Sequence, residues 1–276
     1  MKEEMIQKAL LVCGVTLTIL FCLGPFFYMV LTAFGRHPDF LLPGKAYTPT
    51  LDNFRVVIFS ESIPFMTYLK NSILISAISA VVSVGLVSPA AYAIARLPLP
   101  GKAAFLFGAL GISMFPEISL ISYLFKLMSA MNLVNTYMAL ILPYIAWTMP
   151  LSLWILVSYF SQVPRDLDRA AQIDGASRLQ ILFKIILPLA APGVYATGLL
   201  AFIFAFNEFL FALMLTIDHS ARTIPVGIAL FEGFHGQIPW GQIMAGASVA
   251  SLPVVALTLV FQRRIVQGLT RGAVKG

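Results

Sequence analysis

Residues 164–192 read PRDLDRAAQIDGASRLQILFKIILPLAAP and form a polar stretch in a strongly apolar chain. Pro164 suits the first position of a helix, and two aspartates follow in the first turn, where the helix dipole favours acidic side chains. Gly175 is the residue type that most often ends a helix. The stretch therefore predicts a short helix that stops at Gly175, followed by a second helix from about 177 to 187.

The first of these helices carries small residues on one face. The residues that share this face by their three- and four-residue spacing are Leu167, Ala170, Ala171 and Asp174. The two alanines permit another surface to approach closely, so the helix is suited to docking on a second protein. A re-entrant segment, or a connector lying on the membrane surface, fits the same pattern, and the pattern alone leaves this choice open.

The composition places most of the chain in lipid. Apolar residues make up 59% of the 276 residues and charged residues only 11%, whereas a soluble domain carries about a quarter charged residues. The apolar residues come in long blocks, as membrane-spanning helices require. The net charge of +6 does not indicate nucleic-acid binding, because Lys and Arg lie in short connections between the blocks and not on one polar face.

Six apolar blocks are long enough to cross a bilayer, which takes about 20 residues each. They predict an all-α polytopic membrane protein with six transmembrane helices, near 9–34, 70–95, 103–127, 137–160, 189–217 and 242–262. The first block is too long for a signal-peptide core of about 7–15 residues, so we expect it to remain as a span. The expected organisation is an N-terminal span with the first loop (1–69), a transmembrane core containing the connection 161–188 (70–262), and a C-terminal tail (263–276).

The distribution of basic residues predicts the orientation. Most of the 18 Lys and Arg residues fall on one side of the membrane if the N-terminus is cytoplasmic. Because basic residues favour the cytoplasmic loops, both termini and the connection 161–188 are predicted to be cytoplasmic. The loops 35–69 and 218–241 are then extracytoplasmic.

The stretch at 164–192 resembles the EAA loop found in the permease subunits of type I ABC importers. The matching residues are Ala170, Ala171, Asp174, Gly175, Ala176, Phe183, Ile186, Leu187, Pro188 and Pro192. The sequence departs from the family at Arg169, which stands where a glutamate is usual, although Asp168 precedes it and could serve the same face. In that family the loop forms a coupling helix that seats in a cleft of the ATP-binding subunit. The resemblance implies this role for Leu167, Asp168, Arg169, Ala170, Ala171, Asp174 and Gly175.

Other stretches resemble the second permease subunit of the maltose/trehalose-type, carbohydrate-uptake branch. They are AYAIAR (91–96), FNEFL (206–210, with Phe206 in place of the common Trp), TIPVG (223–227) and GLTRGAVKG (268–276). The resemblance implies half of a translocation path for a disaccharide such as trehalose or maltose, working by alternating access in a prokaryotic inner membrane. Permeases for glycerol phosphate and other solutes share most of these features and remain an alternative.

The same resemblance implies a set of partners. These are a second homologous permease subunit, two copies of an ATP-binding subunit, an extracytoplasmic sugar-binding protein and membrane lipid. Contacts with the binding protein are expected from Phe231, Glu232, Phe234 and His235 in the last outer loop.

Polar and aromatic residues inside the predicted spans are candidates for a sugar path, because sugars need hydrogen-bonding groups and aromatic faces. The candidates are Glu117, Tyr123, Phe206, Asn207 and Glu208. Intramembrane polar residues usually face a cavity or a partner. Hydrogen bonding between helices is therefore an equally good interpretation of Asn207 and Glu208.

The sequence contains no Gly-x-x-x-x-Gly-Lys-Ser/Thr phosphate loop and no nucleophile–base set. We therefore expect no enzyme activity and no bound cofactor in this chain, with ATP and Mg used by the partner subunits. The three histidines lack metal-ligand spacing, so no metal site is expected. An ion-driven transporter using Glu117 or Glu208 is the other class considered, but it leaves the 161–192 segment without a role.

Overall fold

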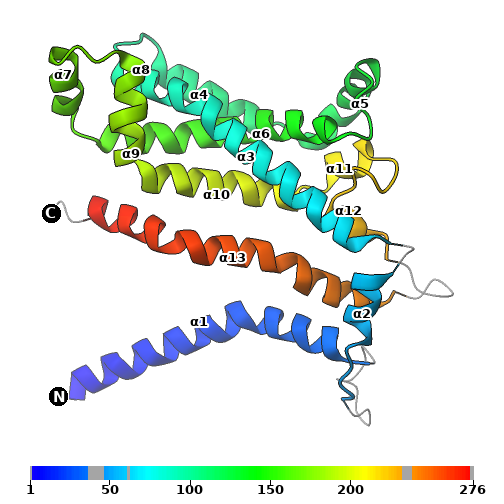
Figure 1. Cartoon of the computed structure of the whole chain (residues 1–276). Coiled ribbons are helices and arrows are strands. Elements are labelled where there is room, and N and C mark those ends of the chain that lie inside the picture. The colour runs from blue at the N-terminus through cyan, green and yellow to red at the C-terminus, as the bar shows by residue number, and fades with distance from the viewer. Residues whose placement is uncertain (1, 37–46, 61–62, 232–237, 274–276) are drawn as a thin grey trace. The chain divides into compact units, whose positions relative to one another are not determined.

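The computed structural model describes residues 2–36, 47–60, 63–231 and 238–273. Apart from one isolated bridge between Gly35 and Pro49, the regular elements of this described part are helices (Figure 1). They are α1 (Lys2–Phe34), α2 (Asp52–Phe59), α3 (Phe65–Arg96), α4 (Lys102–Ser113), η1 (Glu117–Leu120), α5 (Ile121–Ala130), α6 (Tyr137–Gln162), α7 (Arg165–Ile173), α8 (Arg178–Ile181), η2 (Leu182–Ile186, a π-helical turn), α9 (Leu187–Leu189), α10 (Ala191–Asn207), α11 (Leu210–Leu215), α12 (Ile224–Ala229) and α13 (Trp240–Ala273).

Four helices in the described residues are long and apolar enough to cross a membrane, and up to six spans result if each bent helix pair counts as one. The first bent pair joins α4 to the η1–α5 segment at 83°, and the second joins α8–α9 to α10, also at 83°. The first bend falls inside the span expected at 103–127, and the second falls at the start of the span expected at 189–217. Proline explains them, because Pro116 has no amide hydrogen to continue α4, and Pro192 fits only the first turn of a new helix.

The chain divides into two compact units. The first combines residues 1–66 with 227–252, and the second combines 67–226 with 253–276. Residues 227–252, which the sequence assigns to the transmembrane core, therefore group with the N-terminal part. Helix α13 continues to Ala273, into the stretch expected to be a tail.

In the first unit, the side chain of Asn53 on α2 connects α2 to α1. Its Nδ2 donates to the carbonyl oxygens of Ala33 and Gly35 at 2.9 Å each, which fixes α2 against the end of α1. Gly241, at the start of α13, lies so close that a Cβ there would be 2.6 Å from the same Nδ2. The most apolar window of α1 has none of its residues buried within this chain.

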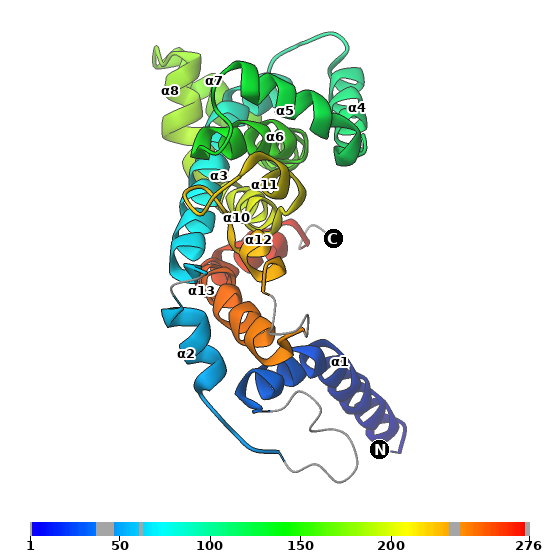
Figure 2. The ribbon, with the colours of Figure 1, turned by 90° about the vertical axis from the view of Figure 1, so that its right-hand side faces the viewer.

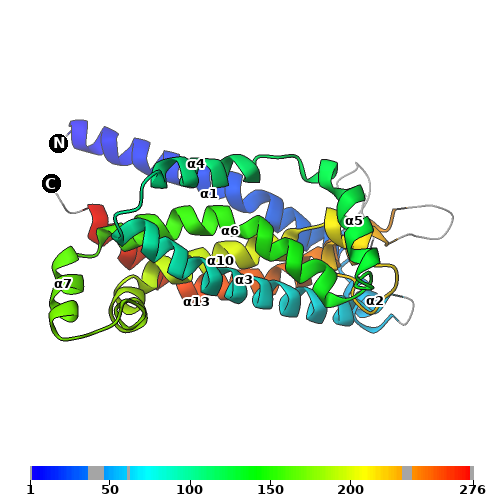
Figure 3. The same cartoon turned by 90° about the horizontal axis from the view of Figure 1, so that it is seen from above.

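The second unit is built around α6. Figures 1 and 3 show α3, α6 and α10 running side by side in this unit. The contact of α10 with α6 requires Gly193, because a Cβ at this position would lie 2.1 Å from the Cγ of Tyr159. The contact of α3 with α6 includes a hydrogen bond from the Thr148 hydroxyl to Ser83 Oγ, at 3.0 Å.

Candidate functional site

Helix α7 is short, and hydrogen bonds define its C-terminal end. After it, Gly175 adopts φ +82°, a conformation that L side chains rarely take. The Gly175 amide donates to the carbonyl of Gln172 (3.1 Å) and the Ala176 amide to the carbonyl of Ala171 (2.9 Å). This pair of bonds is the Schellman arrangement that closes a helix C-terminus. The predicted stop at Gly175 is confirmed.

The chain restarts at once as α8. Ser177 caps it through a reciprocal box, in which its amide donates to Gln180 Oε1 (2.7 Å) and its hydroxyl accepts from the Gln180 amide (3.3 Å). The predicted second helix therefore exists, although it contains the π-helical turn Leu182–Ile186. Both ends of the 174–177 connection are held by hydrogen bonds, so α7 and α8 meet at a defined corner.

Figures 1 and 3 show α7 at one end of the second unit, beyond α6. Its exposed residues include Leu167, Arg169, Ala170 and Ile173, and the C-cap residue Asp174 is exposed as well. Ile173 is the most exposed of its large apolar residues, at 86%. Sequence reasoning missed Ile173, although a large apolar residue in a polar helix was an available signal.

The small-residue face expected from spacing is divided in the structure. Ala171 is buried in an apolar cluster with Phe160 of α6 and Ile181 of α8, while Ala170 is exposed. The face available to another protein is thus formed by Leu167, Ala170 and Ile173, and Ala171 fastens the helix to its own unit.

Asp168 does not share the face of Arg169, contrary to the expectation from their adjacency. It is 8% exposed, and its Oδ2 lies 3.5 Å from Nε of Arg96, the last residue of α3. Nη2 of Arg96 also donates to the carbonyl of Val163 at 2.7 Å. The reason is helical geometry, since successive residues of a helix point about 100° apart. Arg169 itself is exposed and donates from Nη1 to Oδ1 of Asp166 at 3.3 Å.

Glu208 lies at the break between α10 and α11 and is 7% exposed. Its Oε1 accepts from the amide of Phe211 (2.7 Å), and its Oε2 accepts from the amide of Ala212 (3.2 Å) and the hydroxyl of Tyr144 (2.6 Å). The carboxylate thus caps α11 and joins it to α6. This geometry matches the inter-helix interpretation of Glu208, not that of a group lining a path.

The side chains of the other four path candidates differ in how far they are exposed. Asn207 is exposed and its Nδ2 donates to the Ile203 carbonyl of its own helix at 2.8 Å. Phe206 is buried, and its ring stacks on that of Phe202. Glu117 is half-buried at the bend after Pro116, and Tyr123 is 69% exposed on α5.

A hollow of about 200 Å³ between α4, α6 and α10 is lined in part by hydroxyl side chains and by one indole ring. Its polar lining comes from Ser113, Trp147, Thr148, Ser152 and Thr197. None of the five path candidates lines it. The i, i+4 spacing of Thr148 and Ser152 was the available sequence signal, but only the fold adds Ser113 and Thr197.

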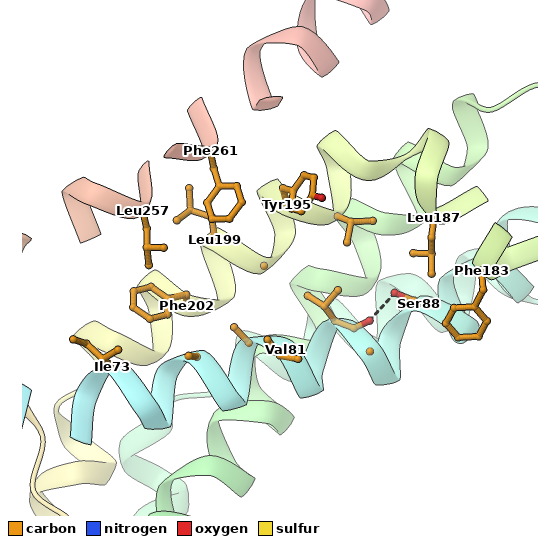
Figure 4. Close-up of a pocket in the computed structure, with 16 residues that line it drawn as sticks. Ile73, Val81, Ser88, Phe183, Leu187, Tyr195, Leu199, Phe202, Leu257 and Phe261 are labelled. Carbon is orange, nitrogen blue, oxygen red and sulfur yellow. Dashed lines mark hydrogen bonds between the residues drawn. The ribbon is translucent and has the colours of Figure 1, made fainter. Parts of the chain in front are cut away.

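A larger groove of about 530 Å³ in the second unit is lined almost entirely by apolar side chains of α3, η2, α9, α10 and α13 (Figure 4). The Ser88 hydroxyl in this groove donates to the Val84 carbonyl of its own helix at 2.6 Å. The groove offers little to a sugar and suits hydrocarbon.

The opposite end of the second unit is held by a polar cluster that sequence reasoning missed. Asn135 accepts at Oδ1 from the amides of Ile217 (3.0 Å) and Asp218 (3.2 Å), and its Nδ2 donates to Ser220 Oγ (3.1 Å). Asn71 donates from Nδ2 to the carbonyls of Ser220 (3.0 Å) and Arg222 (2.9 Å). The hydrogen bonds from Ser220 and Asn135 lower the pKa of Asp218 from 3.8 to about 2.

His219 also belongs to this end, where its ring stacks on Tyr68 and its Nδ1 is hydrogen-bonded to the Tyr68 hydroxyl. The described residues contain no group of three His, Cys, Asp or Glu side chains able to hold a metal. Of the four expected contacts with a binding protein, Phe231 is buried, and Glu232, Phe234 and His235 lie outside the described residues.

Comparisons with known proteins identify relatives over the whole chain. The family described as "Binding-protein-dependent transport system inner membrane component" matches residues 10–271. The trehalose/maltose transport system permease protein MalG of Thermococcus litoralis is 52% identical, covering 100% of both chains. The trehalose transport system permease protein SugB of Mycobacterium tuberculosis is 47% identical, covering 83% of each chain.

A solved structure of a bacterial ABC transporter involved in the import of the polysaccharide alginate has the same fold. It aligns with a TM-score of 0.77 and 19% sequence identity, covering 95% of this chain and 98% of the other. At this identity the likeness shows the fold alone.

Proposed function

The chain belongs to the family of binding-protein-dependent transport system inner membrane components, and on this premise we propose that it imports a disaccharide of the trehalose or maltose kind. The observation that carries the choice of sugar is the 52% identity to a trehalose/maltose permease over the full length of both chains. A relative named for sulfoquinovosyl glycerol is 43% identical over 83% of this chain. A glycerol-linked substrate is thus the second candidate.

In this proposal the ATPase is a separate subunit, and α7 is the helix that docks on it. The exposed Leu167, Ala170 and Ile173 supply the docking face, and Gly175 ends the helix so that α8 can turn back. The α7 end and both termini then face the cytoplasm, in agreement with the bias of basic residues. A second permease subunit completes the pore, and a sugar-binding protein delivers substrate to the opposite end. The exposed side chains of α1 face lipid or this second subunit.

We further propose that the hollow beside Trp147 belongs to the sugar path. Carbohydrates present apolar ring faces and many hydroxyls, so an indole next to Ser and Thr side chains is suitable chemistry for them. In the hollow, the hydroxyl of Thr197 donates to the Gly193 carbonyl of its own helix at 2.8 Å, which leaves its oxygen able to accept from a sugar. The apolar groove of Figure 4 lacks such groups.

The experiment is uptake into proteoliposomes that contain the chain with its partner permease, ATPase and binding protein. We expect accumulation of labelled trehalose or maltose only when ATP is supplied on the side of α7. Unlabelled glycerol-linked sugars serve as competitors, and their complete competition at equal concentration would favour the second candidate.

An ion-driven transporter makes the opposite prediction. Uptake that persists without ATP and follows a proton or sodium gradient would contradict the proposal. The three hydrogen bonds to the Glu208 carboxylate weigh against its use as an exchanging group, because they engage it in joining α11 to α6.

A further inference from the structure

The attachment of α7 to its own unit involves one buried ion pair. Its members are Arg96, at the end of α3, and Asp168, at the middle of α7, whose side chains are 3% and 11% exposed. The apolar part of the attachment is Ala171, which packs among residues of α6 and α8. The remaining side of α7, with Leu167 and Ile173, points away from this cluster and is exposed.

Arg96 contacts two parts of the segment at once. Its Nε faces Oδ2 of Asp168 at 3.5 Å, and its Nη2 donates to the carbonyl of Val163 at 2.7 Å. Val163 is the residue between α6 and the Pro164 that precedes α7. The planar guanidinium can hold both points in a fixed geometry, which the single point charge of a lysine cannot do.

This pair is not arranged for maximal stability. Nε and Nη1 of Arg96 and Oδ1 of Asp168 are buried and have no hydrogen-bond partner. Buried ion pairs with incomplete hydrogen bonding are often no more stable than apolar side chains of similar size. Stability alone therefore does not account for this pair.

Helix α3 links Arg96 to the hollow beside Trp147. Arg96 is the last residue of α3, and Ser83 on the same helix accepts a hydrogen bond from Thr148, which lines the hollow beside Trp147. Ser83 lies 13 residues earlier, or roughly 20 Å along the helix axis. Helix α3, held at both points, joins the attachment of α7 to the hollow.

We propose that Arg96 is a positioning residue that passes movement of α7 to α3 through Asp168 and Val163. When the ATPase displaces the exposed face of α7, Arg96 makes the end of α3 move with it. This inference rests on the proposed function, because it assigns the route from the docking helix to the sugar path.

The test compares Arg96→Gln and Asp168→Asn in the complete reconstituted complex. Three quantities are measured: co-purification of the ATPase, ATP hydrolysis with and without sugar-loaded binding protein, and sugar uptake. We expect the ATPase to remain bound and to hydrolyse ATP, while sugar taken up per ATP falls by about fivefold or more, a usual size of coupling between sites. The double variant should be no worse than the poorer single variant, because the two side chains act as one unit.

Asp166→Asn is the matched control. It makes the same chemical change on the same helix, but the side chain of Asp166 is 88% exposed and is ion-paired with the exposed Arg169 instead of Arg96. Its uptake per ATP should equal that of the wild type. Arg96→Lys should give an intermediate ratio, because it keeps the charge and loses the double contact.

Two results would overturn the inference. One is an unchanged uptake-to-ATP ratio, measured per assembled complex, in both single variants. The other is loss of ATPase binding in Arg96→Gln, Asp168→Asn and Arg96→Lys alike, which would make the pair a part of the docking structure. Failure of the wild-type complex to import sugar with ATP would instead contradict the proposed function, so the two failures are distinguishable.

Discussion

The two ends of the second unit, marked by α7 and by α11 (Figure 1), are held in different ways, and Figure 2 turns the α11 end toward the viewer. At the α11 end, Asn135 and Asn71 make five hydrogen bonds to a single loop, residues 217–222. At the α7 end, the polar attachment is the pair of Arg96 and Asp168, with several of its atoms unpaired. A loop fixed by many directed bonds keeps one shape, whereas a helix held at few points can move as a body.

The largest effect is expected at the break before α11. Glu208→Ala leaves two backbone amides and the Tyr144 hydroxyl without their acceptor. An unsatisfied buried group costs about 1–3 kcal/mol, so the free energy of unfolding should fall by about 3 kcal/mol or more. Unfolding of the purified permease in detergent, followed by circular dichroism, measures this change.

Asn207→Ala is the control for that substitution. Asn207 is the neighbouring residue, but it is exposed and bonded only within its own helix, so its replacement should change stability by about 0.5 kcal/mol or less. Equal losses for the two variants would show that the α11 end is not held by Glu208.

The next effect is expected at the end of α7 and should be functional more than structural. Gly175→Val forces a β-branched residue into φ +82°, and a left-handed conformation costs about 1–2 kcal/mol. The stability loss should therefore be modest, while the turn into α8 changes and co-purification of the ATPase is lost.

Gly101→Val tests whether strain alone explains such a loss. Gly101 has φ +69°, and a Cβ added there, as at Gly175, would meet no atom within 4 Å. Unlike Gly175, it precedes α4 and lies outside the coupling segment. The variant should lose similar stability and still bind the ATPase. Retention of the ATPase by Gly175→Val would contradict the docking role of α7.

The smallest effect concerns pH at the α11 end. The pKa of Asp218 is lowered from 3.8 to about 2, because hydrogen bonds from Ser220 and Asn135 favour the carboxylate. A lowered pKa in the folded state stabilises the protein above the ordinary pKa, and this contribution is lost as the pH falls from 3.8 to about 2. Asp218→Asn should remove this part of the acid sensitivity, which thermal unfolding at about pH 5 and about pH 2.5 would detect.

An equal acid sensitivity in Asp218→Asn and the wild type would show that the Asp218 bonds do not support the loop. The effect should be small, because Asp218 is exposed and water screens its interactions. A large difference would mean that the α11 end depends on this one carboxylate. It would then resemble the α7 end instead of contrasting with it.

The local features of this chain could be predicted from the sequence. Apolar blocks of sufficient length indicate membrane helices because every backbone polar group must be bonded within lipid. The stop at Gly175 follows from its freedom to adopt positive φ. Each of these properties depends on residues close together in the chain.

What the sequence could not decide is which side chains meet. Arg96 and Val163 are 67 residues apart, and Tyr144 and Glu208 are 64 apart. In the sequence, Asp168 and its neighbour Arg169 were equal candidates for the functional site, and so were Glu208 and its neighbour Asn207. The fold buries Asp168 and Glu208 and leaves Arg169 and Asn207 exposed. A buried charge needs a partner that only the tertiary structure can supply, and this requirement separates the residues that hold the helices from those left free to bind.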